Sequence, residues 1–247
     1  MKQLIITLCA VAGLFAVSPA FAQADTPFAK ANAEYAAGHF KEAIDGYELL
    51  AGSGQWSATL FYDLGNAYFR TNDFGHAILN YERALALEPR HPEAEANLRI
   101  ARDEARALEL AANAPDHFLQ LMTHSQYTIA AAIAFWIGIF GIVILILARR
   151  RSAGLIALSI LSLFIFAFAV AAIVWLDNGN KGSALAIVTD KGVEARVATA
   201  ETANTVLALP PGSEIKIVSK RGDWIYAVLP NNLRGWISAK SAESVRL

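Results

Sequence analysis

Two long apolar stretches dominate the pattern of hydrophobic and polar positions along the chain. Residues 128–148 and 153–176 contain no charged side chain, and each is long enough to cross the ~30 Å hydrocarbon core of a bilayer as a helix. A soluble core helix of this length would present a polar face, and neither stretch has one. Because backbone amides cannot stay unpaired in lipid and only a short loop separates the stretches, the pattern predicts a hairpin of two transmembrane helices.

The loop between the two stretches, residues 149–152, indicates the orientation of the hairpin. It contains Arg149, Arg150 and Arg151, whereas residues 108–127, before the first stretch, contain no Lys or Arg. Short loops rich in basic residues stay in the cytoplasm. We therefore expect a two-pass protein whose flanking regions both lie outside the cytoplasm.

Residues 1–22 have the pattern of a secretory signal peptide. Lys2 precedes an apolar run over residues 4–17, and an A-x-A cleavage sequence ends at Ala22. An uncleaved anchor is the alternative, but the apolar run is short for a span and Pro19 follows it closely. Cleavage would place the next region in the periplasm of a bacterium, with the hairpin in the inner membrane.

An internal repeat with a period of 34 residues lies within residues 23–113. The same four residue types recur at this spacing, as Phe40 and Phe74, Ala43 and Ala77, Ile44 and Ile78, Tyr47 and Tyr81. The period and the pattern resemble the tetratricopeptide repeat, which implies an all-α domain of stacked helix pairs closed by a capping helix from residue 92. The residues expected to pack these helices are Phe61, Leu64, Gly65, Tyr68, Ala77, Tyr81, Ala84 and Pro89. Residues 114–127 would then link the repeats to the membrane.

The first helix of each unit in such a repeat normally lines a concave groove. Asn32 and Asn66 occupy equivalent places on these helices, and amides there can hydrogen-bond an extended peptide or a terminal carboxylate. The expected basic partners in the groove are Arg70, Arg99 and Arg102. A common structural asparagine at this place in the repeat is the alternative.

Residues 181–247 change to short alternating segments separated by Pro, Gly and Asn turns, a pattern that predicts β-strands. The order of glycines and tryptophans resembles a bacterial SH3-like domain, which implies an all-β barrel. Arg196 and the three residues after it depart from the family's R-S-G-P pattern, so no ligand site is assigned to that loop. We expect Trp236 in the core and Trp224 half exposed. The candidate surface residues are Lys216, Lys220, Arg221, Trp224, Arg234 and Trp236.

The overall charge of −1 conceals an asymmetry between the two flanks of the hairpin. Residues 23–127 hold eight basic and fifteen acidic side chains, a net charge of −7, whereas residues 181–247 hold nine and six, a net charge of +3. Opposite charges on one side of the membrane favour a salt-sensitive contact between the flanks, or binding of an anionic polymer by the basic one. An ordinary solvated surface is the alternative.

No catalytic motif is present, so we expect a protein that is not an enzyme and needs no cofactor or metal. Cys9, the only cysteine, lies in the expected signal peptide, which excludes a disulfide or thiol chemistry in the mature chain. His117 and His124 lie in the linker, and with Asp116 they make an incomplete ligand set, so we expect solvated side chains there. No nucleic-acid partner is expected.

The order of the modules, from signal peptide through repeats and hairpin to SH3-like domain, resembles the BatE-type proteins of aerotolerance operons. The resemblance implies a non-enzymatic scaffold or accessory subunit in an envelope stress complex. Its implied partners are membrane proteins with von Willebrand factor A domains and, indirectly, a MoxR-type AAA+ ATPase. The alternative is an anchor or sensor in which the basic domain binds peptidoglycan or another cell-wall polymer.

Overall fold

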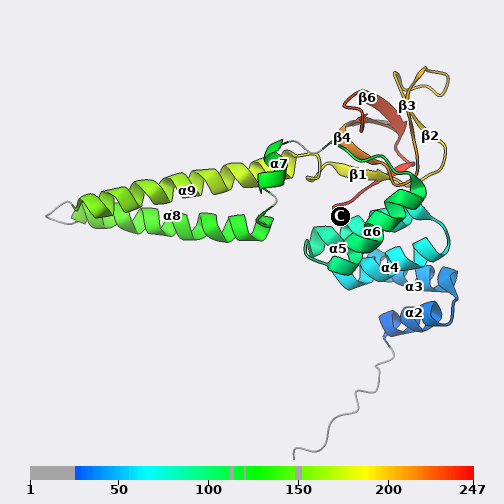
Figure 1. Ribbon diagram of the computed structural model, residues 1–247, viewed down its shortest axis with the longest axis horizontal. Helices are drawn as coiled ribbons and strands as arrows, with labels where there is room; N and C mark the ends of the chain where they lie inside the picture. The colour runs from blue at the N-terminus through cyan, green and yellow to red at the C-terminus, as the bar shows by residue number, and fades with distance from the viewer. Residues whose placement is uncertain (1–25, 112–113, 120, 148–151) are drawn as a thin grey trace, which may run out of the picture.

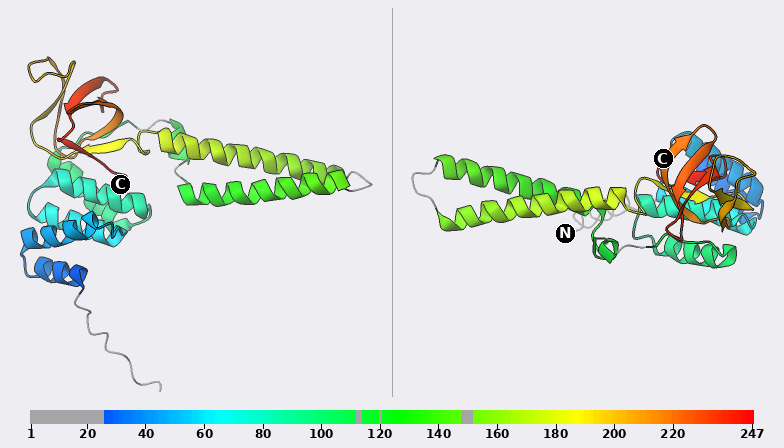
Figure 2. Two further views of the ribbon diagram at one scale, coloured as in Figure 1. Left: turned by 180° about the vertical axis from the view of Figure 1, so that it is seen from behind. Right: turned by 90° about the horizontal axis from the view of Figure 1, so that it is seen from above.

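The computed structural model describes residues 26–111, 114–119, 121–147 and 152–247. The expected signal peptide, residues 1–22, and the three arginines at 149–151 lie outside the described residues. Figure 1 shows a stack of helices, a long helical hairpin that projects to one side, and a twisted sheet that lies over the stack. The stack and the sheet therefore sit together at one end of the hairpin (Figures 1 and 2).

The stack consists of five antiparallel helices: α2 (Pro27–Ala36), α3 (Phe40–Gly52), α4 (Ala58–Arg70), α5 (Phe74–Leu87) and α6 (Pro92–Ala105). Side chains cap their free N-terminal amides, with Thr26 accepting from Ala29 and Ser57 from Leu60, each at 3.1 Å. Asn72 turns the chain between α4 and α5 with φ 60°, a left-handed conformation that asparagine tolerates. These local signals explain why the helices begin and end where the 34-residue period places them.

Close contact between α4 and α5 depends on a small residue. A Cβ atom on Gly65 would lie 2.7 Å from the Tyr81 ring, so the two helices can approach this closely only with glycine there. Phe61, Leu64, Ala77 and Ala84 are buried with these two residues, whereas Tyr68 is half-buried and Pro89 is exposed just beyond the end of α5. The helical region is thus packed like a tetratricopeptide array.

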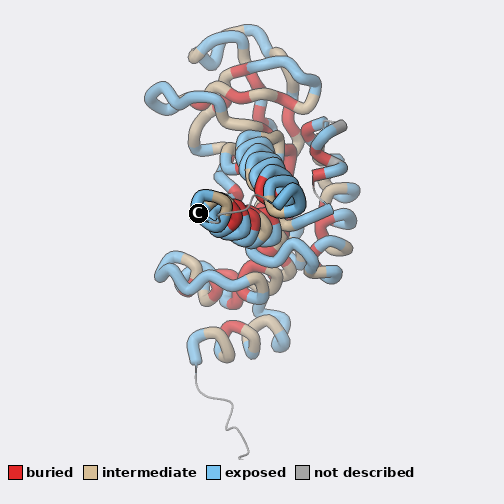
Figure 3. Tube along the Cα trace, turned by 90° about the vertical axis from the view of Figure 1, so that its left-hand side faces the viewer, coloured by how far each residue is buried: buried red, intermediate tan, exposed pale blue. Residues whose placement is uncertain are grey.

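The hairpin begins after a short helix, α7 (Ala114–Leu119), and consists of α8 (His124–Leu147) and α9 (Ala153–Asn178). Both helices are long and apolar enough to cross a membrane, with mean hydropathy of 2.8 and 2.7. They meet through small residues: a Cβ on Gly138 would lie 3.0 Å from the Ser162 hydroxyl, and Gly141 faces Ser159 even more closely. Their other faces are exposed and apolar, as the pale-blue tube of the hairpin shows in Figure 3.

The C-terminal region forms one open antiparallel sheet in the order β3-β2-β6-β5-β4-β1-β7. Its strands are β1 (Leu185–Val188), β2 (Val193–Arg196), β3 (Thr205–Leu209), β4 (Glu214–Arg221), β5 (Trp224–Val228), β6 (Arg234–Ser238) and β7 (Ala242–Ser244). The strand pairings establish an open antiparallel sheet. They do not show the closed barrel that the sequence pattern predicts. The short strand β7 has no alternating apolar pattern, which is why the sequence does not predict it.

The sheet and the helical stack share a hydrophobic core. Strand β1 lies on α5, and Ile78 packs in one buried cluster with Leu185, Ile187 and Val245. Gly75 contacts the backbone of Thr189 so closely that a Cβ atom there would overlap it. The two flanks of the hairpin, which we expected as separate domains in weak contact, are joined by buried apolar packing.

Candidate functional site

A groove crosses the first helices of the successive repeat units. Its walls come from α2, α4 and α6 and from one residue of α5, and the residues around its cavity of about 190 Å³ are Tyr35, Asn66, Phe69, Arg70, Tyr81, Asn97 and Ile100. The cavity has aromatic walls, two amides at its base and one basic side chain at its edge. A groove of this kind fits an extended peptide with an apolar side chain and a nearby acceptor.

The two asparagines predicted to bind a partner have a structural role as well. Asn32 Oδ1 accepts a hydrogen bond from the Tyr47 hydroxyl at 2.7 Å, and Asn66 Oδ1 accepts one from the Tyr81 hydroxyl at 2.8 Å. Burial raises the pKa of both tyrosines, which keeps them protonated and able to donate. Each repeat unit therefore uses its asparagine to satisfy a buried tyrosine fifteen residues later.

Asn66 also accepts a hydrogen bond from Asn97 Nδ2 at 2.8 Å, which connects α4 to α6 across the floor of the groove. Arg70 lies at the edge, with its guanidinium 4.5 Å from the centre of the Phe40 ring. This cation–π contact holds the guanidinium beside the groove while Arg70 as a whole stays exposed. Asn66, Arg70 and Asn97 are thus the polar groups that the fold brings together here.

Arg99 and Arg102 lie outside this groove. Arg99 is exposed on α6 and lines a separate cleft beside the base of the hairpin. Arg102 is almost completely buried between α6 and the sheet, where it is ion-paired with Glu82 and Glu214 and lies 3.2 Å from Glu109. Its placement differs from the expected groove position, because its partner Glu214 belongs to a strand far along the chain.

The ion cluster around Arg102 connects the stack to the sheet. Glu214 is fully buried, its Oε2 accepts the Leu110 amide at 3.0 Å, and Lys181 Nζ lies 3.4 Å from its Oε1. Burial raises the pKa of Glu82, and the positive charge of Arg102 opposes that rise. Since each charge has a partner, the cluster is a structural connection between the two regions.

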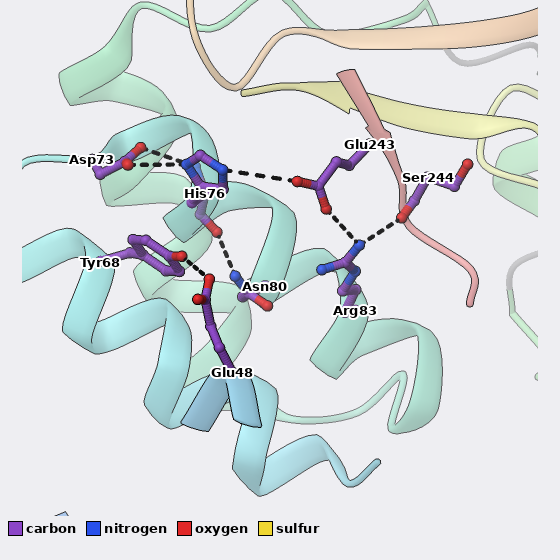
Figure 4. Close-up of polar contacts among 8 residues, drawn as sticks. All are labelled: Glu48, Tyr68, Asp73, His76, Asn80, Arg83, Glu243 and Ser244. Carbon is purple, nitrogen blue, oxygen red and sulfur yellow. Dashed lines mark hydrogen bonds and ion pairs between the residues drawn. The ribbon is translucent and has the colours of Figure 1, made fainter. Parts of the chain in front are cut away.

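A second polar network joins α5 to β7 (Figure 4). His76 Nδ1 lies 2.9 Å from Asp73 Oδ2, and its Nε2 lies 3.8 Å from Glu243 Oε1. Arg83 donates to Glu243 at 3.0 Å and also to the carbonyl of Ser244. The Asp73 side chain raises the pKa of His76, which burial partly opposes. The D-x-x-H spacing at the start of α5 is the sequence signal for this network, which we had not predicted.

The aromatic residues of the sheet gather on the face opposite its core. The rings of Tyr226 and Trp236 lie 4.9 Å apart, and Arg196 stands opposite Trp236 on the neighbouring strand. Trp224 is half-buried beside Arg221. Trp236 is also half-buried, which differs from the expected core position because alternation along β6 places Ile237 and not Trp236 inside.

The remaining basic candidates of the sheet differ in their contacts. Lys216 donates to the carbonyl of Asn178, so it connects the sheet to the end of α9. Lys220 is exposed, and Arg234 is exposed opposite Val228. Among the residues that the structure describes, no group of three His, Cys, Asp or Glu side chains could hold a metal ion.

Comparison with known protein families shows a match to part of the chain. The tetratricopeptide repeat matches residues 58–91, which correspond to α4, α5 and the turn that precedes α6. Among curated proteins, none matches the chain. The similarity thus covers the unit whose groove contains Asn66 and Arg70, and tetratricopeptide repeats generally bind protein partners.

Proposed function

We propose that this protein is a non-enzymatic scaffold of the bacterial inner membrane that binds a protein partner through the groove of its repeats. The observation that carries the proposal is the groove across α2, α4 and α6, in which Asn66 and Asn97 form a polar floor and Arg70 stands at the edge. Aromatic walls with a few fixed polar groups suit an extended segment of a partner protein.

The order of repeats, apolar hairpin and sheet supports a more specific setting. We propose that the sheet is an SH3-like module and that the complex is an envelope stress or aerotolerance assembly. Its partners would be membrane proteins with von Willebrand factor A domains, linked indirectly to a MoxR-type ATPase. The repeats and the sheet would both lie in the periplasm, because both lie beside the start of α8 and the end of α9, whereas the three arginines come in the sequence between the end of α8 and the start of α9.

Groove binding is tested by changing a residue that contributes to the groove and not to the fold. Ile100 is exposed on α6, so Ile100→Glu should leave the fold intact and place a carboxylate among the apolar walls. Arg99→Glu is the matched control, since Arg99 is the neighbouring exposed residue outside the groove. Co-purification with a co-expressed von Willebrand factor A domain membrane protein should fall at least tenfold with Ile100→Glu only. Equal recovery of the partner with Ile100→Glu and with Arg99→Glu would contradict groove binding.

The orientation of the chain is tested with reporter fusions. Alkaline phosphatase is active only in the periplasm, so a fusion after Leu247 should be active and a fusion after Ser152 inactive. The opposite pattern would contradict the proposed topology and the periplasmic scaffold with it.

A second function, binding of peptidoglycan, is favoured by the outer face of the sheet. The Tyr226 and Trp236 rings contact each other there at a tilt, with Arg196 opposite Trp236 and Arg221 opposite Trp224, and aromatic rings beside cations suit an anionic glycan polymer. Retention of the purified protein on isolated peptidoglycan, reduced severalfold by Trp236→Ala, would favour this function. No retention at low salt would exclude it.

A further inference from the structure

Exposed apolar side chains gather at the end of the helical stack that faces the base of the hairpin. Trp56, in the loop between α3 and α4, is 49% exposed, and Leu87, at the end of α5, is 51% exposed. Leu247 is 58% exposed beside them. With residues 123–125, these three side chains help to line one cleft of about 530 Å³. The groove described above does not include any of them.

The position of this cleft relative to the hairpin is defined by its lining. Thr123 and Ser125 come from the start of α8, whereas Trp56 and Pro89 come from the two loops at the near end of the stack. Figures 1 and 2 show the same arrangement, with the ends of α3 and α5 directed toward the hairpin. Where α8 enters a bilayer, the two loops therefore face the surface of that bilayer.

Polar contacts hold the hairpin in this position. Arg246 Nη1 lies 2.9 Å from Asp177 Oδ1, which connects the end of the sheet to the end of α9. Trp175 Nε1 donates to Asp116 at 2.8 Å, and the Lys216 contact described above adds a second connection to the sheet. Because the stack and the sheet share a core, the loops cannot swing away from the start of α8 without breaking the two contacts between the sheet and the end of α9.

Trp56 has the chemistry of a residue at a membrane interface. Its indole Nε1 donates to the carbonyl of Ala51 at 2.9 Å, so the polar atom of the ring is satisfied within the protein. The half-exposed ring is left to contact apolar groups. Tryptophan is enriched at the level of lipid headgroups because its ring is large, apolar and only locally polar, and leucine side chains beside it add apolar area.

We propose that this end of the repeat stack rests on the lipid bilayer, with Trp56, Leu87 and Leu247 in its interfacial layer. The inference rests on the proposed function in one respect, that α8 and α9 span the membrane. The adjacent charges are mixed, with Arg90 and Arg246 against Glu88. The contact is therefore apolar in origin and does not require anionic lipid.

The consequence for the scaffold is a fixed orientation of its groove. A stack that only hung from a linker would present the groove in every direction, whereas a stack that also rests on lipid presents it at one angle to the membrane. Partners anchored in the same membrane would then meet the groove already oriented, which lowers the entropic cost of binding.

Spin labels report the depth of single positions in the full chain. In a Cys9→Ala background, which is free of cysteine, the label is attached at Leu87→Cys, with Gln55→Cys beside Trp56 as a second position. Lys41→Cys, exposed at the far end of α3, is the aqueous control, and Ile133→Cys, exposed on α8, is the membrane control. Nanodiscs of phosphatidylcholine alone hold one chain each, and collisions with oxygen and with a nickel chelate are measured.

The inference predicts that labels at positions 87 and 55 collide with the nickel chelate at least threefold less often than the label at position 41. Adding phosphatidylglycerol or salt should not change this. If positions 87, 55 and 41 behave alike while position 133 is shielded by lipid, the surface contact is refuted and the membrane scaffold stands. If position 133 is also aqueous, both proposals fail. Shielding that appears only with two chains per disc would refute lipid as the occupant.

Discussion

Replacing Arg102 by methionine should destabilise the helical stack and the sheet together. The methionine side chain is apolar and of similar length. It lacks the charge with which Arg102 faces Glu82 and Glu214 between the stack and the sheet. Removing one partner from a buried ion pair typically costs roughly 3–5 kcal/mol, because the other charge is left uncompensated. Lys181 lies 3.4 Å from Glu214 and supplies part of the missing charge. We therefore expect a loss of about 3 kcal/mol, at the lower end of that range.

The loss of stability caused by Arg102→Met should depend on pH, and the direction follows from the protonation of Glu82. Burial raises the pKa of Glu82 in the folded protein, and removal of Arg102 raises that pKa further. A carboxyl whose pKa is higher in the folded state than in the unfolded state stabilises the fold at low pH and loses that effect as pH rises. The destabilisation by Arg102→Met should therefore be smaller at pH 5 than at pH 8.

Thermal unfolding of the full chain in detergent micelles, followed by near-ultraviolet circular dichroism, measures the effect. A loss of about 3 kcal/mol corresponds to a fall in Tm of roughly 6–12 °C for a domain of 150–250 residues. Arg99→Met, on the same helix but exposed, is the matched control and should leave Tm nearly unchanged. Adding Glu82→Gln and Glu214→Gln to the Arg102 variant should restore much of the loss. Equal destabilisation in the triple variant would show that packing, and not uncompensated charge, explains the effect.

Three further changes test the packing and the second polar network. Gly65→Leu should destabilise the repeat by about 1–3 kcal/mol, because the new side chain overlaps the Tyr81 ring, and an unchanged Tm would contradict that contact. Gly75→Ala should lower Tm and expose the interface between stack and sheet to hydrogen exchange, since its Cβ overlaps the backbone of Thr189. His76→Gln should cost most stability below about pH 6 and progressively less above it, because the folded pKa of His76 is raised; a constant difference from pH 5 to 8 would refute this.

Patterns in the local sequence predicted the secondary-structure elements of this fold well. The 34-residue period marks a repeat that the tetratricopeptide family confirms over residues 58–91, and the uncharged stretches correspond to α8 and α9. The small residue at position 65 also follows from the period, because a helix contact that recurs in every unit leaves the same trace in the sequence. Signals of this kind come from the local sequence or from its repetition along the chain.

Contacts between distant parts of the chain could not be predicted in this way. Arg102 looks like any surface arginine on a polar helix, and its partner Glu214 is 112 residues away. Residues 185–188 are all apolar, which indicates a strand buried on both faces, but nothing in them indicates that α5 covers one of these faces. The sequence predicted the role of Asn66 only in part. Its position on the groove follows from the 34-residue period, whereas its hydrogen bond with Tyr81 depends on the exact distance between α4 and α5.

The hairpin interrupts a core that is complete only when both of its flanks are present. Ile78 and Leu185, which share one buried cluster, are separated in sequence by the linker and both apolar helices. During synthesis the repeats therefore emerge before β1 and β7, and one apolar face of α5 stays uncovered until these strands have been made. Such long-range closure is slow and leaves the intermediate open to aggregation or proteolysis. In the proposed membrane topology, β1 and β7 reach that face only after both helices of the hairpin have been inserted.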